Sequence, residues 1–356
     1  MKRTIALFLT LVLLLAVTAC AANPAAASQD AATTAAAATA TAETVTTADT
    51  TAQPAELTKV RFLLDWTPNT NHTGLYVAQE LGLYKDAGLD VEIVQPTEGG
   101  ALSLVAAGKA DFCVSFQEEI ASALTSSQPL PITAVAALIQ HNTSGIISLA
   151  ENSIVTPKAM ENHVYASWDT PIEKAILSAI AKADGGSYDK IKVVPNTVTD
   201  VVAALQTDVD MVWVYYAWDG IATELASLKT NFINFGQVNP ALDFYTPVLA
   251  SSNDYLAKNP EIARKFLAAT AKGYEYAISN PDDAAAILVK NAPGMDIQLA
   301  KKSQAWLKDQ YKAEVANWGQ IDTARWDRFY TWMYDQALIE KKIGSGEGFT
   351  NDYLPN

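Results

Sequence analysis

Cysteine and histidine are both scarce in this 356-residue sequence, which holds two cysteines and three histidines. Two cysteines, Cys20 and Cys113, cannot build a disulfide framework or a cysteine cluster for zinc or an iron–sulfur centre. The histidines are widely spaced and show no metal-ligand pattern, so we expect no metal site. We expect His141 and His163 to be solvated. Cys113 lies in an apolar run, which predicts a small, buried side chain.

Basic residues are also in deficit, with 25 Lys and Arg against 39 Asp and Glu and a formal net charge of -14. A chain this acidic is repelled by nucleic acids and by anionic membrane surfaces, so we expect neither as a partner. The sequence contains no Gly-x-Ser-x-Gly motif, Walker loop or dinucleotide fingerprint. We therefore predict no catalytic residue and no cofactor.

A long apolar run occurs once, at residues 5–17, after Lys2 and Arg3 and before two small residues and Cys20. A basic start, an apolar stretch and small residues at the cut describe a secretory signal. The cysteine after the small residues resembles a lipobox, where Cys20 would be lipidated. A transmembrane helix and an ordinary signal peptide are the alternatives, but the run is shorter than the roughly 20 residues that a span needs. We expect an extracytoplasmic protein, lipid-anchored to the cell membrane at the cell surface or in the periplasm.

Residues 21–56 are mostly Ala and Thr and contain no aromatic residue. Such a composition cannot bury enough apolar surface to offset the entropy of ordering. It predicts a flexible tether with a root-mean-square reach of roughly 30–35 Å. The remaining stretch of about 300 residues, a length that suits two compact domains, holds all eight Trp and all fourteen Tyr.

Strand and helix patterns alternate through the first part of this stretch. Strands are predicted at residues 60–64, 90–94 and 111–116, with helices at residues 73–84 and before residue 107. Alternation at this spacing predicts a mostly parallel α/β sheet.

A short repeat suggests a second, similar lobe. Residues 103–112 and 202–211 each have the pattern of an apolar helix, a turn, an Asp and a strand. The alternative is that this pattern is the usual turn between any helix and the strand that follows it. We predict lobe one at 57–145 plus 250–356 and lobe two at 146–249. Extended segments near Ser144–Leu149 and Thr246–Ser251 are expected to join them.

The C-terminal third is predicted to be helical, with an amphipathic helix at residues 260–279 and another starting at Pro281. Its aromatic residues lie three or four apart, so we expect them to pack these helices against lobe one instead of contacting a ligand.

Ligands of open α/β sheets bind outside the carboxyl ends of the strands. Aromatic, acidic and amide residues gather in the loops that follow the predicted strands, and Glu98, Gly99 and Gly100 begin a helix that could hold an anion. Without these ligand roles, the aromatics would be rim or core residues and the glycines an ordinary turn. No Arg lies in these loops, whereas aromatic faces beside carboxylates suit a flat, nitrogen-rich ring. The candidate ligand-binding residues are Trp66, Asn69, His72, Glu98, Gly99, Gly100, Ser115, Gln117, Glu118, Trp168, Tyr215, Tyr216, Trp218 and Asp219.

One motif is specific enough to indicate a family. The run Leu-Asp-Trp-Thr-Pro-Asn-Thr-Asn-His at 64–72 resembles the thiamine-precursor branch of periplasmic-type binding proteins, which are related to fungal hydroxymethylpyrimidine-synthesis proteins. Weaker matches follow along nearly the whole remaining chain, at residues 108–112, 115–118, 168–173 and 215–218.

The resemblance implies a two-lobed α/β receptor, similar to class II periplasmic binding proteins, that closes on an aminopyrimidine. It would deliver a hydroxymethyl- or formylaminopyrimidine to the permease and ATPase of an ABC importer, and we expect a monomer. By resemblance, Trp66 and either Tyr215 or Tyr216 would sandwich the ring. Asn69, Glu98 and Glu118 would bond to its nitrogens.

The fungal relatives leave an enzyme as the alternative of another class. They use a histidine at the position of His72 and a cysteine-rich iron-binding segment, which would fall near Phe244–Ser252, where this chain has no cysteine. The export signal also argues against an enzyme of pyrimidine synthesis in the cytoplasm. Within the transport class, a flavin, nitrate, a sulfonate or taurine is the alternative cargo.

Overall fold

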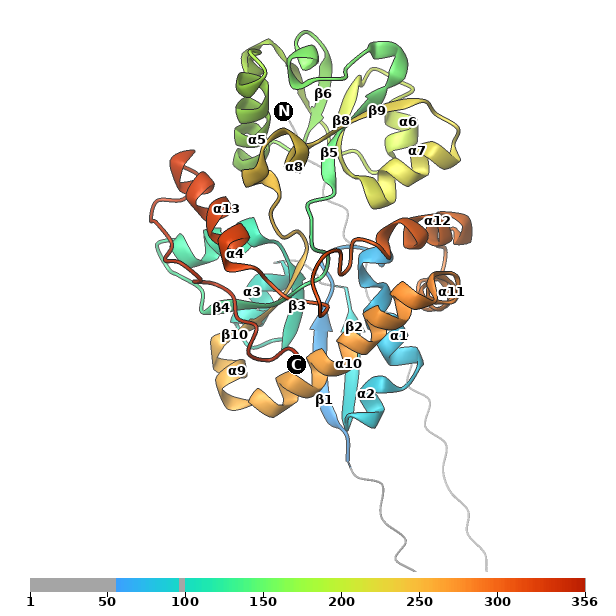
Figure 1. Cartoon of the computed structure of the whole chain (residues 1–356), viewed down its shortest axis with the longest axis vertical. Helices are drawn as coiled ribbons and strands as arrows, with labels where there is room; N and C mark the ends of the chain where they lie inside the picture. Colours follow the sequence, from blue (N-terminus) through green and yellow to red (C-terminus); the bar gives the residue numbers. More distant parts are fainter. Residues whose placement is uncertain (1–55, 96–99, 356) are drawn as a thin grey trace, which may run out of the picture. The chain divides into compact units, whose positions relative to one another are not determined.

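The computed structural model describes residues 56–95 and 100–355. The predicted signal peptide with Cys20, nearly all of the predicted tether, and the site residues Glu98 and Gly99 lie outside the described residues. They remain predictions. The described residues contain two five-stranded sheets (Figure 1).

The first sheet has the strand order β2–β1–β3–β10–β4. The strand β1 pairs in parallel with β2 and β3, whereas β10 runs antiparallel between β3 and β4. Every residue of β3 and of β10 is buried, as expected for inner strands covered on both faces. The strands are β1 Thr58–Leu63, β2 Leu89–Val94, β3 Phe112–Ser115, β4 Ile132–Ala137 and β10 Val248–Ser252.

The second sheet repeats this arrangement in the order β7–β6–β8–β5–β9. Here β6 is parallel to β7 and β8, and β5 runs antiparallel between β8 and β9. The prediction of a two-lobed α/β fold is confirmed. Both sheets are mixed, but four of the five strands in each run in one direction and only β10 or β5 opposes them, so the expectation of a mostly parallel sheet is also confirmed. The strands are β5 Ser144–Leu149, β6 Val164–Ser167, β7 Lys192–Pro195, β8 Met211–Tyr215 and β9 Thr230–Asn234.

The aspartates of the short sequence repeat have the same role in the two sheets. The backbone N–H of Arg61 donates to Asp111 Oδ2 at 2.7 Å, and that of Val164 donates to Asp210 Oδ2 at 2.7 Å. The N–H of each aspartate returns a bond to the carbonyl of the same partner, at 2.9 and 3.0 Å. Each Asp therefore fixes the start of one strand against its parallel neighbour, which explains why the pattern recurs.

Two crossover segments, residues 138–143 and 243–247, run between the sheets. The predicted connections, Ser144–Leu149 and Thr246–Ser251, lie mostly in the inner strands β5 and β10. Their extended, apolar sequence belongs to strands buried on both faces, a pattern that cannot be told from a connector by sequence alone. The chain changes sheet a few residues before the predicted lobe boundaries at 145 and 249.

A cluster of charged side chains links the two crossover segments. His141 Nδ1 lies 2.8 Å from Asp243 Oδ2, and His141 Nε2 lies 2.8 Å from Glu314 Oε2. Arg325 completes the cluster, with Nη2 at 2.8 Å from Glu314 Oε1, and it also donates to the backbone carbonyl of Gln140. His141 is only partly exposed and fully hydrogen-bonded, so the expectation that it is solvated was wrong.

The pKa values in this cluster favour its charged form. The hydrogen bond with Asp243 raises the pKa of His141 although burial opposes the shift. Burial alone would raise the pKa of Asp243, but bonds from His141 and from the Asn142 backbone hold it below its ordinary value. Burial also opposes the shift at Glu314, where its own backbone N–H, His141 and Arg325 lower the pKa to about 2.

Helices cover both sheets (Figure 1). The predicted helix at residues 73–84 is two helices, because Gly82 adopts a positive φ of 74° between them. The helix predicted at 260–279 has those bounds, and one starts at Pro281 as expected. The α-helices are α1 Thr73–Glu80, α2 Leu83–Asp86, α3 Ala101–Ala106, α4 Gln117–Thr125, α5 Pro171–Ala183, α6 Val201–Ala204, α7 Ile221–Leu225, α8 Phe235–Val238, α9 Asn253–Lys258, α10 Pro260–Ser279, α11 Pro281–Asn291, α12 Ile297–Leu307 and α13 Thr323–Asp335.

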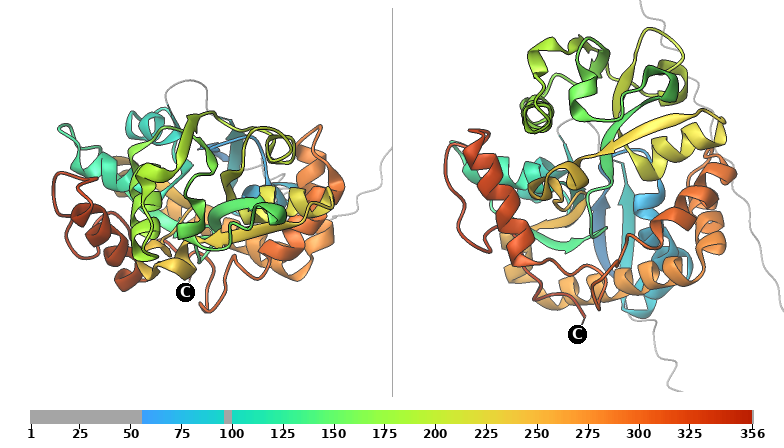
Figure 2. Two further views of the ribbon diagram at one scale, coloured as in Figure 1. Left: turned by 90° about the horizontal axis from the view of Figure 1, so that it is seen from above. Right: turned by 45° about the horizontal axis from the view of Figure 1, so that its top comes forward.

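The long helix α10 packs directly on α1 beside the first sheet. A Cβ added at Gly273 would lie 2.0 Å from the carbonyl oxygen of Gly74, so the two backbones touch there. Near the C-terminus, α13 lies beside α4 (Figure 2), and Gln117 Nε2 donates to the carbonyl of Trp326 at 2.9 Å. The helices α10 and α13 thus pack beside the first sheet, as predicted for the C-terminal helices.

The helix α12 makes contacts of a different kind. Ser303 donates to the carbonyl of Ala217, and Lys302 Nζ lies 2.7 Å from Glu224 Oε2, both in elements next to the second sheet. Within residues 56–95 and 100–355, no helix combines the length and apolarity needed to cross a bilayer.

Replacing Gly273 with Ala should lower the free energy of unfolding by about 1–3 kcal/mol, because the added methyl group forces α10 away from α1. Chemical denaturation of both proteins measures the difference. Lys272→Ala, at the exposed neighbouring position of the same helix, is the control and should change stability by less than about 0.5 kcal/mol. Equal stability of the Gly273→Ala variant would contradict the close backbone contact.

His141→Gln should lower stability by up to about 1 kcal/mol, since the bonds are partly screened by solvent. The pKa of His141 is raised in the folded protein, so the histidine stabilises the fold at pH values below its unfolded-state pKa. This stabilisation is lost as pH rises through the folded-state pKa. The pKa values of Asp243 and Glu314 are lowered, so these carboxylates stabilise the fold at pH values above their unfolded-state pKa values, and this stabilisation is lost as pH falls. The loss should therefore be largest between about pH 4.5 and 6.5.

Thermal unfolding across pH, with the same substitution made in an Asp243→Asn background, tests this prediction. In that background most of the pH-dependent difference should disappear. A difference that does not vary with pH would show that the cluster is not charged.

Candidate functional site

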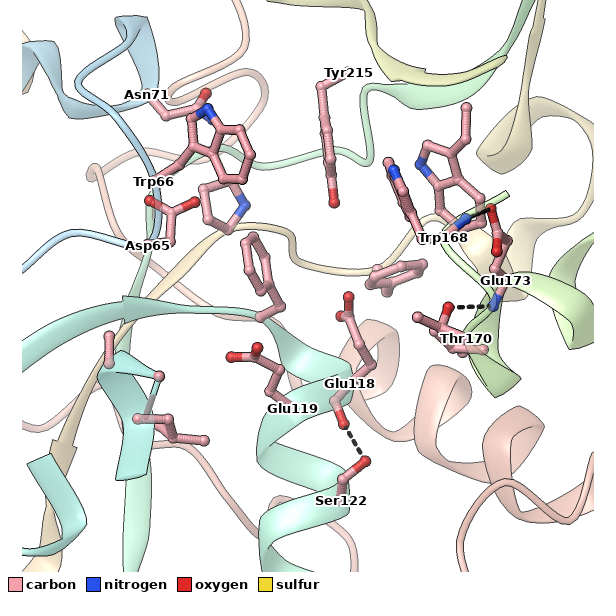
Figure 3. A pocket seen from close by; sticks show the side chains of 18 of the residues that line it. Asp65, Trp66, Asn71, Glu118, Glu119, Ser122, Trp168, Thr170, Glu173 and Tyr215 are labelled. Atoms are coloured by element: carbon pink, nitrogen blue, oxygen red, sulfur yellow. Dashed lines mark hydrogen bonds between the residues drawn. The ribbon is translucent and has the colours of Figure 1, made fainter. Parts of the chain in front are cut away.

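A cavity of about 1030 Å³ lies among the loops that follow the strands of both sheets. Its volume is at the upper end of the range for small-molecule sites. The lining is aromatic and acidic, as the close view of its side chains shows (Figure 3). The aromatic members are Trp66, Phe116, Trp168, Trp213, Tyr215, Trp218 and Phe244, and the carboxylates are Asp65, Glu118, Glu119, Glu173 and Asp219.

The loop after β1 supplies Asp65, Trp66 and Asn69. The Asn69 side chain accepts the backbone N–H of Asn71 at 2.9 Å and so caps the 3-10 helix Thr70–His72. The backbone N–H of Asn69 donates to His72 Nδ1 at 3.1 Å, so the ring proton of a neutral His72 sits on Nε2. That atom lies 2.7 Å from Asp65 Oδ1. His72 is fully buried behind the loop and orients the Asp65 carboxylate at the cavity.

The first turn of α4 brings Glu118 and Glu119 to the cavity. Ser115, the last residue of β3, donates to Glu119 Oε2 at 2.8 Å. Burial raises the pKa of Glu118 to about 8, and the neighbouring charge of Glu119 adds to the shift. Burial also raises the pKa of Glu119, against the hydrogen bond from Ser115. Both carboxyls are therefore destabilised as anions, which favours a ligand that donates hydrogen bonds or carries positive charge.

The loop after β6 forms the opposite wall. Glu173, on the first turn of α5, is buried and accepts from Ser167 Oγ at 2.7 Å and from the Trp168 backbone N–H at 3.2 Å, as well as from the Tyr165 hydroxyl. Thr170 caps the same helix. Because Glu173 ties the loop to its strand, the Trp168 ring is held over Trp213 with centroids 5.5 Å apart.

The segment after β8 completes the cavity. Tyr215 ends the strand, and the single-turn π-helix Tyr216–Gly220 carries Trp218 and Asp219; such turns are frequent at functional sites. Burial raises the pKa of Asp219 to about 6. Trp66, in the loop after β1, and Tyr215, at the end of β8, project into the same space (Figure 3).

The structure brings together eight of the residues predicted from sequence. These cavity-lining residues are Trp66, Asn69, Gly100, Glu118, Trp168, Tyr215, Trp218 and Asp219. Four others lie off the wall: His72, Ser115, Gln117 and Tyr216.

Each of these four has another partner in the fold. His72 and Ser115 orient the cavity carboxylates Asp65 and Glu119. Gln117 Oε1 accepts the backbone N–H of Tyr245 at 2.9 Å and so ties α4 to a crossover segment. The Tyr216 hydroxyl donates to Glu224 at 2.6 Å, outside the cavity. We therefore do not propose that these four residues contact the ligand. Of the two adjacent tyrosines, Tyr215 faces the cavity.

Sequence reasoning missed several lining residues. Asp65 directly precedes Trp66, and Glu119 directly follows Glu118, so strand-end position alone would have included both. Glu173 lies within the family match at residues 168–173. Trp213 lies in the buried strand β8, where no sequence signal distinguishes it from a core tryptophan.

The charge of the lining is one-sided. Among the described residues that form it, five are carboxylates and none is Lys, Arg or His. Within residues 56–95 and 100–355, no group of three or more His, Cys, Asp or Glu side chains could hold a metal ion. The side chains present can stack on a flat ring, accept hydrogen bonds and neutralise positive charge.

Relatives of the chain include a binding protein and an enzyme. A formylaminopyrimidine-binding protein of Halalkalibacterium halodurans is 27% identical over 313 residues, covering 85% of this chain and 93% of that protein. A 4-amino-5-hydroxymethyl-2-methylpyrimidine phosphate synthase of Legionella pneumophila is 22% identical over 309 residues, covering 84% and 93%.

Solved structures share the fold at low identity. The alkanesulfonate-binding protein SsuA of Xanthomonas axonopodis pv. citri, bound to MOPS, superposes with a TM-score of 0.63 at 13% identity, covering 83% of this chain and 99% of that one. The periplasmic nitrate-binding protein NrtA of Synechocystis gives 0.61 at 15% identity, covering 80% and 83%. These likenesses support the two-lobed fold alone.

The family described as NMT1/THI5 like matches residues 69–284. That span begins inside the motif at residues 64–72, on which the family resemblance was based. The predicted family is therefore confirmed. Because the match covers more than half of the sequence, this chain belongs to the NMT1/THI5-like family.

Proposed function

We propose that the protein is an extracytoplasmic, lipid-anchored receptor that binds a flat, nitrogen-rich ring, a thiamine pyrimidine precursor, and delivers it to an ABC importer. The observation that carries this proposal is the cavity lining, which is rich in aromatic and acidic side chains and has no basic one among the described residues. An aminopyrimidine offers a π-face for stacking and amino groups for the carboxylates. The name of the relative from H. halodurans supports this ligand class.

The same observation weighs against the anionic cargoes. Nitrate, sulfonates and taurine carry an acidic group that needs a cationic partner or a set of N–H donors. Burying an anion beside Asp65, Glu118 and Glu119 would add repulsion to desolvation. The structural likeness to sulfonate- and nitrate-binding proteins therefore reflects the shared fold, and not a shared ligand.

A pyrimidine-synthesis enzyme is the candidate of another class, because several relatives are synthases. In this chain His72 is buried and held between Asn69 and Asp65, which suits a supporting residue better than a reagent. The predicted export signal that ends at Cys20 supports a location outside the cytoplasm. Contacts of one ligand with both sheets would then favour a closed state that the permease recognises.

Protein purified natively from its own cells, without refolding, should carry a small nitrogen heterocycle. Mass spectrometry of the released molecules identifies it, and titration calorimetry with that compound should show one site per chain. Nitrate and taurine should give no heat of binding. Absence of binding by any aminopyrimidine would refute the proposal, and turnover of one would establish the enzyme instead.

Trp66→Ala should weaken binding of the ring about 10- to 100-fold, the loss expected for one stacking face. Because Trp66 is 59% exposed, the melting temperature should stay nearly unchanged. Calorimetry and thermal unfolding of one preparation measure both.

The matched control is Tyr334→Ala, which removes an exposed aromatic ring of α13 outside the cavity lining and should affect neither quantity. A large loss of stability in Trp66→Ala would identify Trp66 as a packing residue.

A further inference from the structure

Two buried polar atoms of the cavity have no hydrogen-bond partner within the protein. Among the described residues, four buried side-chain atoms lack a partner, and two of these, Glu118 Oε2 and Trp213 Nε1, belong to residues that line the cavity. One is a carboxyl oxygen from α4, next to the first sheet, and the other is an indole N–H donor from β8 in the second sheet. Leaving such an atom unpaired typically costs about 1–3 kcal/mol, so a binding partner is expected.

The surroundings of Glu118 show why the protein itself does not satisfy it. The nearby hydroxyls of Tyr215 and Tyr330 are already engaged, with Thr246 Oγ1 at 3.4 Å and with the carbonyl of Gln117 at 3.2 Å. Glu119, on the same turn, takes the hydroxyl of Ser115. Figure 3 shows the Glu118 carboxyl pointing into the space between the two walls. Its raised pKa agrees with an acid that lacks a compensating donor.

The Trp213 ring is fixed by its neighbours. It meets Phe235 edge-on with centroids 4.4 Å apart, and it packs against Trp168 at 5.5 Å. Only 6% of the residue is exposed. The ring therefore cannot turn its N–H toward solvent without losing these contacts.

We propose that Glu118 and Trp213 together determine ligand specificity: Glu118 takes a hydrogen-bond donor of the ligand, and the Trp213 N–H takes an acceptor. This inference rests on the proposed function and narrows the ligand to a heterocycle with both an amino group and an unprotonated ring nitrogen or a carbonyl. An aminopyrimidine meets both requirements. A pyrimidine without the amino group meets only the second, and an aniline only the first.

The donor requirement is tested with Glu118→Met, which removes the carboxyl and keeps the side-chain length. The probes are 4-amino-5-hydroxymethyl-2-methylpyrimidine and the same compound without its amino group. Wild-type protein should bind the amino compound about 5- to 100-fold more tightly, because the compound without the amino group leaves the buried Glu118 oxygen unpaired. In Glu118→Met the two affinities should agree within about threefold, because the partner of the amino group is gone.

Stability should move in the opposite direction. Replacing an unpartnered buried carboxyl by an apolar side chain should raise the melting temperature of the empty protein by about 1–3 °C. A change that weakens binding of one probe while stabilising the fold cannot come from misfolding. The control Glu261→Met removes one carboxylate from the exposed face of α10 and should alter neither the probe preference nor the melting temperature.

Trp213→Phe tests the acceptor requirement separately, because it removes the N–H and keeps an aromatic ring. The substitution should weaken binding of the amino compound about 5- to 20-fold. The variant should still prefer the amino compound over the compound without its amino group. If wild-type protein binds neither probe, nor the compound released from natively purified protein, the proposed function fails. If wild type binds the amino compound and Glu118→Met keeps the wild-type preference, the assignment of Glu118 is overturned and the proposed function stands. Unchanged affinity in Trp213→Phe overturns the assignment of Trp213.

Discussion

The contact between His141 and Asp243 joins the only two segments, among the described residues, through which the chain passes from one sheet to the other. Each crossover continues directly into an inner strand, β5 or β10, so its position fixes the middle of a sheet. The walls of the cavity come from different sheets, with Trp66 and Glu118 on one side and Trp168 and Tyr215 on the other. The relative placement of these walls depends on the bonds that hold the crossovers together.

The cavity combines supported and unsupported acids. Asp65 is held by His72, Glu119 by Ser115, and Glu173 by three donors of its own lobe. Glu118 has no such donor at Oε2. Carboxylates gathered without a cation repel one another and resist ionisation. A ligand that brings donors or positive charge relieves this repulsion, so affinity and charge selectivity come from the same arrangement.

Much of this arrangement could be predicted from the sequence, because it depends on local patterns. Trp66, Glu118 and Tyr215 lie at or just after the ends of strands, and this position predicts that they are close in space. The repeat around Asp111 and Asp210 predicts two similar lobes. The antiparallel direction of β5 and β10 could not be predicted from the sequence. Both have the composition of an ordinary apolar strand, and their direction is set by strands that are distant in the sequence. The same limit applies to Trp213, whose indole faces a cavity that exists only once both sheets are folded.

The charged cluster at the crossovers shows the limit most clearly. His141, Asp243, Glu314 and Arg325 come from three separate regions of the sequence, and none belongs to a recognisable motif. Their partnership depends on where the C-terminal segment returns after α12. Sequence reasoning works well for residues within one strand–loop–helix unit and fails for groups assembled from several.

The insertion of β10 between β3 and β4 has a consequence for the order in which the chain can fold. The second sheet is built from one continuous stretch, residues 144–234, and can form as soon as that stretch is available. The first sheet cannot, because Val248 pairs with both Ser115 and Ala137 at its centre. Loop closure over such separations is slow. The N-terminal strands β3 and β4 therefore stay incompletely paired until β10, which follows the whole second sheet in the sequence, takes its place between them.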